Sequence, residues 1–221
     1  MKQKKAFSQA GTEIVKSMLK SGWMTALMAA FCFTAVFTAY SAVTAGLYSG
    51  MAARIAFAVL YAYAAAQLVL FRINTDAKLL RRLAGFCFLL CVGTWILSGI
   101  TLILTVIYAL GIDSHIREQS TWIMGAAAFL LVCMGNHFRL VRKALLQAKD
   151  MLEGNIPQRD AFRPAAVSAF TVALLSAAVF IFYRPSPGSL SVVLILAAGV
   201  ILRLSLGFLF LRGSRRLLST K

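Results

Sequence analysis

Small polar side chains recur at helical spacing between residues 87 and 105, and they are the first place where this sequence could do chemistry. The stripe alternates intervals of four and three residues: Cys87, Cys91, Thr94, Ser98, Thr101 and Thr105. A period of 3.5 residues places all of them along one side of a helix. In a membrane, such a seam either lets two helices pack closely or lines a polar path for a solute. We expect close packing, with the solute lining as the alternative.

One arginine lies inside an apolar run. Arg203 precedes Arg212 by nine residues, which is about 13 Å along a helix. A charge at this depth is costly on an isolated helix, so it should face protein, water or a bound anion. At a similar depth in two other runs lie Asn136, His137 and Gln67. We predict one polar layer of these four residues, which either binds an anionic solute or holds helices together; His137 is either a proton-handling group or an interfacial residue.

Recognisable catalytic motifs are missing from the sequence. No Asp or Glu occurs within any apolar run, which excludes a carboxylate relay or paired-acid chemistry inside the membrane. Cys87 and Cys91 are one helical turn apart but have no second cysteine pair or nearby histidine, so we expect neither a metal site nor a disulfide. No glycine-rich phosphate loop is present. We therefore predict a protein without enzymatic activity, cofactor or metal.

Six long apolar runs must position these residues. The chain of 221 residues is 60% hydrophobic and 14% charged, whereas a soluble domain is about 25% charged. Each run has about 18 residues or more, enough for a helix to cross a hydrocarbon core of about 30 Å. The runs are Trp23–Gly46, Ala53–Phe71, Ala84–Leu110, Thr121–Phe138, Ala165–Tyr183 and Ser189–Leu211. The prediction is an all-α integral membrane protein with six transmembrane helices in three hairpins.

Basic residues give this bundle an orientation. Of the 23 Lys and Arg residues, 19 lie in the two termini and in alternate gaps, three lie in the other gaps or, for Arg54, at their edge, and Arg203 lies deep within a run. Because the cytoplasmic side retains positive charge, both termini are predicted to be cytoplasmic, in the plasma (inner) membrane. The net charge of +16 then suits anionic lipid headgroups of the inner leaflet, and we expect no nucleic-acid partner.

The predicted organisation has a basic N-terminal segment (1–22), a transmembrane domain (23–211) and a basic tail (212–221). The first run could instead be a signal peptide cleaved after Val43-Thr44-Ala45. That run exceeds 20 residues, whereas the apolar region of a signal peptide has about 7–15, so we expect an uncleaved helix.

The loop 139–163 is the longest on the cytoplasmic side. Its apolar residues fall at helical spacing opposite Arg142, Lys143 and Lys149, which predicts an amphipathic helix that continues the fourth run and ends near Gly154-Asn155. This helix either lies on the anionic inner leaflet or docks a membrane or cytoplasmic subunit.

These features lead to two expected functions. A small bundle with hydroxyl seams and an arginine at depth favours a non-enzymatic transport component, either a permease or a membrane subunit for a small, preferably anionic solute. The alternative is a scaffold or accessory subunit of a membrane protein complex, in which the same seams are interfaces.

Overall fold

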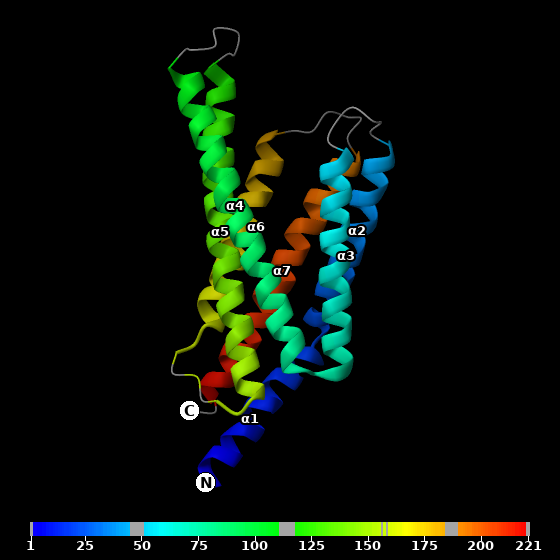
Figure 1. The fold of residues 1–221 in the computed structure, drawn as a ribbon, viewed down its shortest axis with the longest axis vertical. Coiled ribbons are helices and arrows are strands. Elements are labelled where there is room, and N and C mark those ends of the chain that lie inside the picture. The colour runs from blue at the N-terminus through cyan, green and yellow to red at the C-terminus, as the bar shows by residue number, and fades with distance from the viewer. Residues whose placement is uncertain are drawn as a thin grey trace.

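The computed structural model describes residues 2–44, 51–110, 118–155, 157, 159–183 and 190–219. In that part of the chain the backbone forms seven helices and no strand, in agreement with the all-helical prediction (Figure 1). The helices are α1 (Lys2–Leu19), α2 (Gly22–Thr44), α3 (Met51–Asn74), α4 (Ala77–Ala109), α5 (Glu118–Leu152), α6 (Phe162–Tyr183) and α7 (Leu190–Ser219).

Several of these helices are long and apolar enough to cross a membrane. Within the described residues five qualify by length and composition: α2, α3, α4, α5 and α7. The remaining expected crossing corresponds to α6, whose described apolar stretch, Phe162–Ala178, is shorter. A membrane-embedded helical protein is therefore well supported, because such helices satisfy their own backbone hydrogen bonds where no water is available.

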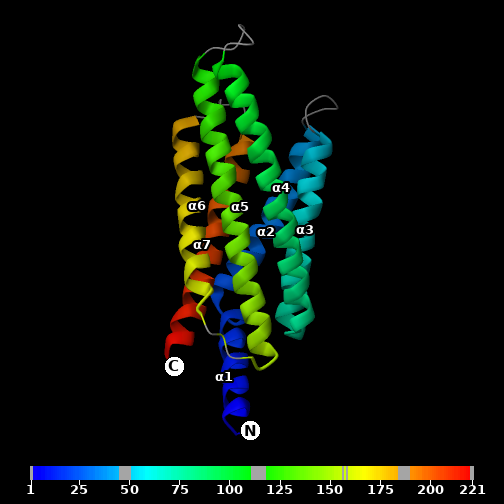
Figure 2. The same cartoon turned by 60° about the vertical axis from the view of Figure 1, so that its left-hand side comes forward.

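The helices pair as hairpins. The closest pairs are α2 with α3, α4 with α5, and α6 with α7, and α2 also packs along α7, whereas α3 and α4 contact each other little (Figures 1 and 2). The α4–α5 hairpin extends beyond the other two at the end opposite α1. Both chain ends lie at the end that carries α1, together with the Arg- and Lys-rich ends of α3, α4, α5 and α7. We call this the basic end.

At the basic end, α4 and α5 extend beyond the apolar runs of their sequences. α4 begins at Ala77, where the Asp76 side chain accepts a hydrogen bond from the Lys78 backbone N–H at 2.9 Å and caps the helix. α5 continues without a break to Leu152, and Gly154 adopts the left-handed conformation (φ 82°) that commonly ends a helix. The amphipathic continuation of the fourth run, including its end, is thus confirmed.

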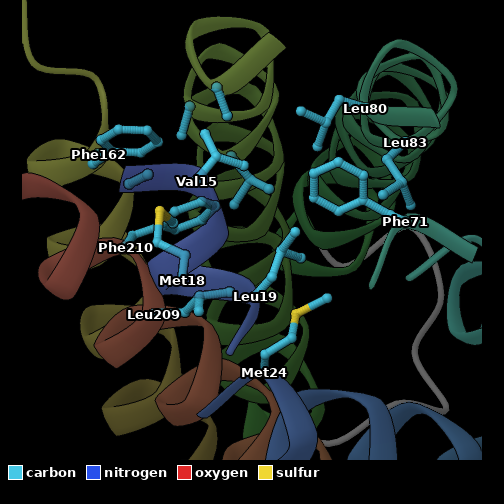
Figure 3. Packing of buried hydrophobic residues seen from close by; sticks show 14 of the residues in the cluster. Val15, Met18, Leu19, Met24, Phe71, Leu80, Leu83, Phe162, Leu209 and Phe210 are labelled. Atoms are coloured by element: carbon cyan, nitrogen blue, oxygen red, sulfur yellow. The ribbon is translucent and has the colours of Figure 1, made fainter. Parts of the chain in front are cut away.

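A helix that the sequence analysis did not predict completes this end of the molecule. α1 is amphipathic and buries Ile14, Val15, Met18 and Leu19. These side chains join a cluster with residues of α4, α5, α6 and α7, and Figure 3 shows Met18 against Phe210 and Leu19 in the same cluster as Phe71. The largest hydrophobic core of the described chain therefore sits at the basic end.

The apolar face of the loop helix belongs to this core. Ala144, Ala148 and Met151 are buried, and Gly11 of α1 approaches so closely that an added methyl group would lie 3.0 Å from the Met151 carbonyl oxygen. The chain's own α1 thus covers the face that we expected to meet lipid or a partner. Docking of another subunit through 139–163 remains a prediction, and it would have to use the polar face.

Side chains tie the segment before α6 to its neighbours. Gln147 of α5 accepts a hydrogen bond from the Ala161 backbone N–H. Asp160 accepts from the Phe162 N–H at 2.9 Å, which caps α6, and from the Ser214 hydroxyl of α7. The described part of the loop is therefore held between α5 and α7.

Candidate functional site

Arg203 is the only basic side chain of α7 that lies well away from the basic end. Its Nη1 donates to the Gly199 carbonyl oxygen at 2.9 Å, and its Nη2 lies 4.0 Å from the Met134 sulfur of α5. Because helical side chains lean toward the N-terminus, the guanidinium extends away from the basic end rather than toward it. Snorkelling to the headgroups is therefore not what this side chain does.

Gly199 makes room for this arrangement. A methyl group at Gly199 would lie 3.0 Å from Arg203 Nη1. A side chain at this position would therefore press on the guanidinium and on its hydrogen bond to the backbone. The glycine and the arginine, one turn apart, form a single unit on the face of α7 that meets α5.

One further polar side chain lies close to this contact. His137 follows Met134 by three residues, so both side chains lie on the same side of α5. His137 is almost fully buried. The guanidinium thus lies against the side of α5 that also carries His137, in the region where we expected a polar layer.

A serine of α6 fixes the orientation of His137. His137 Nδ1 lies 3.0 Å from Ser168 Oγ, and the Ser168 hydroxyl donates to the Ala165 carbonyl oxygen at 2.9 Å. A hydroxyl has one proton, so Ser168 can only accept from His137, and Nδ1 must be the protonated nitrogen. In the neutral imidazole, Nε2 then carries the lone pair. Ser168 was not among the residues expected at this site, since nothing in its sequence context distinguishes it from other helix serines.

The expected four-residue layer is only partly assembled. The Asn136 side chain accepts a hydrogen bond from Arg139 Nη2 at 2.8 Å and lines a groove between α5 and α6. Gln67 is buried on α3, where its Oε1 has no hydrogen-bond partner among the described residues. Arg203 and His137 lie together, whereas no described hydrogen bond joins Arg203 to Asn136 or Gln67.

The hydroxyl stripe of α4 lies in the α4–α5 interface. Ser98 is buried and donates to the Ala128 carbonyl oxygen of α5 at 3.1 Å. A methyl group at Gly125 of α5 would lie 3.8 Å from the Thr105 methyl, whereas one at Gly135 would lie 2.5 Å from the Trp95 ring and 3.0 Å from the Thr94 hydroxyl oxygen, so Gly135 also makes room for Trp95. Small residues on both helices thus bring the backbones close, which is the packing interpretation. Thr101, half-buried, donates to Leu97 of its own helix at 2.8 Å.

Charge compensation is what the site lacks. The seven acidic residues of the chain all lie outside the apolar runs, and no ion pair to Arg203 exists among the described residues. A guanidinium has five N–H donors, and the two contacts above use only part of this capacity. The arrangement is suited to hold a planar or anionic group. In the described part of the chain, no three His, Cys, Asp or Glu side chains gather that could hold a metal.

Comparisons with known protein families, with curated proteins and with solved structures found no match to this chain. Function has to be inferred from the geometry of these residues.

Proposed function

We propose that this chain is a non-enzymatic membrane transport component that binds a small anionic solute beside Arg203. The observation that carries the proposal is the Arg203 guanidinium itself. It is held away from the basic end by Gly199 and Met134, and no described carboxylate neutralises it. An uncompensated charge at this depth is retained where it binds something, because burying it unpaired is costly.

The solute class follows from the chemistry of the guanidinium. Its planar fork matches a carboxylate or phosphate with two parallel hydrogen bonds, and Lys cannot reproduce this geometry. The chain has no motif for using ATP, so it would act either as a permease or as the solute-binding subunit of a larger transporter.

The proposal includes a topology. We infer that the chain crosses the plasma (inner) membrane six times, with α6 as the fifth crossing, and that both termini lie in the cytoplasm. Support comes from the basic residues, because the described ends of α3, α4, α5 and α7 that carry them lie at the end where the chain begins and ends.

The test is a binding screen on the purified full chain in lipid nanodiscs. Small carboxylates, phosphate and sulfate are titrated while the unfolding temperature is followed, because a ligand present at 100 times its Kd stabilises a protein by about 2.7 kcal/mol. We expect one class of anion to stabilise the wild type, R203K to lower its affinity about tenfold or more, and R203M to abolish binding.

Arg54 provides the matched control for this test. It lies on α3 in another candidate span, and its Nη1 donates to the Ser41 carbonyl oxygen at 2.8 Å, so it resembles Arg203 in bonding to a backbone oxygen. R54K should leave the anion affinity unchanged. Failure of every anion to stabilise the wild type, or equal stabilisation of R203M, would contradict the proposal.

A second candidate function, an accessory subunit of a membrane complex, is favoured by the exposed face of α4. Leu89, Ile96 and Ile103 of this helix are about two-thirds exposed, at 69%, 58% and 61%. Lipid or another protein must cover such a face. A spin label at Ile96, measured in native membranes, distinguishes these two coverings. Strong relaxation by dissolved oxygen indicates that lipid covers the face of α4, and weak relaxation indicates that a partner protein covers it.

A further inference from the structure

A second group of basic side chains forms a pocket of about 470 Å³ at the basic end. Its residues are Trp23 of α2 and Phe208, Leu211, Arg212, Arg215, Arg216 and Ser219 of α7. Those of α7 follow one another at intervals of three, one, three, one and three residues, which places them on one face of the helix. This pocket contains none of the residues of the Arg203 site.

The pocket changes in character along the helix axis. Its inner part is aromatic, since Trp23 stacks on Phe208 with ring centroids 4.3 Å apart and the planes inclined by 18°. Its outer part carries three exposed arginines and the hydroxyl of Ser219. From Phe208 to Ser219 the helix rises about 16 Å, which is comparable to a phospholipid headgroup with the upper part of its acyl chains.

Acidic side chains do not neutralise this surface from within its own helix. α7 contains no Asp or Glu, and Arg212 and Arg215 have no ion-pair partner among the described residues. Asp160, which bonds to α7, accepts its hydrogen bond from Ser214, a buried residue that does not belong to the exposed arginine face. The exposed face is therefore strongly positive where the helix leaves its apolar sequence.

We propose that this pocket is a binding site for an anionic glycerophospholipid, whose phosphate lies on Arg212, Arg215 and Arg216 and whose acyl chains lie along Trp23, Phe208 and Leu211. Charge complementarity selects the headgroup, since arginine binds phosphate through two parallel hydrogen bonds. The aromatic half selects a lipid rather than a soluble phosphate, because Trp and Phe offer a large apolar surface at the membrane interface that a free phosphate cannot use. The proposal rests on the embedding of α7 in a membrane and does not depend on anion transport.

Trp23 lies inside the proposed site, so its fluorescence can report the occupant. The full chain is reconstituted in phosphatidylcholine bilayers that contain either brominated phosphatidylglycerol or brominated phosphatidylcholine, because bromine on the acyl chain quenches a tryptophan that it touches. Subtracting the signal of W23F removes the contributions of Trp95 and Trp122. We expect brominated phosphatidylglycerol to quench Trp23 with an association constant at least about fivefold above that of phosphatidylcholine, the factor that one arginine contributes at a charged surface.

Two variants with equal loss of charge separate this site from general attraction to the membrane. R212Q/R215Q/R216Q should abolish the preference for phosphatidylglycerol, whereas K78Q/R81Q/R82Q, which removes three exposed charges from α4, should preserve it. Retained quenching by brominated phosphatidylcholine in both variants shows that each remains embedded and folded.

Three outcomes would overturn the proposal. One is equal quenching by the two brominated lipids in the wild type, and another is an equal effect of the two triple variants. The third is relief of the phosphatidylglycerol-specific quenching by millimolar inorganic phosphate, which would identify a site for soluble phosphate. R212K/R215K/R216K should keep most of the preference, since lysine also binds phosphate as a point charge.

Discussion

At the scale of single residues, Arg54 and Arg203 are held in similar ways and differ in what surrounds them. Arg54 bonds a carbonyl of the neighbouring helix, and so it joins α3 to α2. Arg203 bonds a carbonyl of its own helix and directs Nη2 toward α5. The first has a structural role that its contacts explain, and the second keeps donors available for a ligand.

The pair formed by His137 and Ser168 permits a prediction about one hydrogen bond. Since His137 donates through Nδ1, H137N places an N–H at nearly the same position and should keep the bond, whereas H137Q should lose it. A double-mutant cycle of H137Q with S168A, measured by thermal unfolding in nanodiscs, should give a coupling of about 0.6–1.7 kcal/mol, the range for hydrogen bonds between membrane helices. In the cycle of H137N with S168A the coupling should persist. Zero coupling in both cycles would show that the bond contributes nothing.

The sequence predicted the depth of these residues in the membrane better than the direction in which their side chains point. Asn136 and His137 are at nearly the same depth, but neighbouring residues on a helix point about 100° apart, so only one of them could face Arg203. The structure turns His137 toward α6 and the Arg203 region and turns Asn136 toward Arg139. A position along the chain gives the level in the membrane, whereas the facing side depends on which helices become neighbours.

At the scale of elements, the α4–α5 hairpin shows how a sequence pattern becomes an interface. The stripe on α4 has a match in Gly125, Ala128 and Gly135 on α5, and Ser98 bonds across to Ala128. The sequence of α4 alone shows the 3.5-residue period. Small side chains along one line of a helix indicate a closely packed neighbouring helix. The identity of that neighbour required the structure.

Filling this interface should therefore destabilise the hairpin. S98L removes the bond to Ala128 and adds volume to a packed seam, and overpacking typically costs about 1–3 kcal/mol. The measurement is the unfolding temperature in detergent, with T171L as control, because Thr171 is exposed on α6 and bonds only its own helix. An unchanged unfolding temperature for S98L would show that the seam can open freely.

The amphipathic α1 is an element that was not predicted from the sequence. Its lysines indicate contact with membrane charge, but its apolar residues also recur at helical spacing and so indicate a buried face: Ile14, Val15, Met18 and Leu19. Even with that face recognised, its partners could not have been named. Most of its contacts are with α5 and α7, which are distant in sequence.

At the scale of the whole molecule, charge is separated between the two ends of the bundle. Reporter fusions test the orientation that this separation implies: a fusion after residue 219 should be active only with a cytoplasmic reporter, and an insertion between residues 111 and 117 only with an extracytoplasmic one. R212Q/R215Q/R216Q serves as control, since the other basic ends should maintain the orientation. A C-terminal fusion active on the extracytoplasmic side would contradict the six-crossing topology.

The basic-end core also has a consequence for how the chain is made. α1 precedes the other described helices in the chain, yet its apolar face packs on α5 and α7, and Gly213 lies so close to Met18 that an added methyl group would be 2.7 Å from its sulfur. Part of the face formed by Ile14, Val15 and Leu19 therefore stays uncovered until α7 has been synthesised. A nascent chain stalled before α7 would expose this part to chaperones and proteases, so the complete burial of α1 depends on the synthesis of α7.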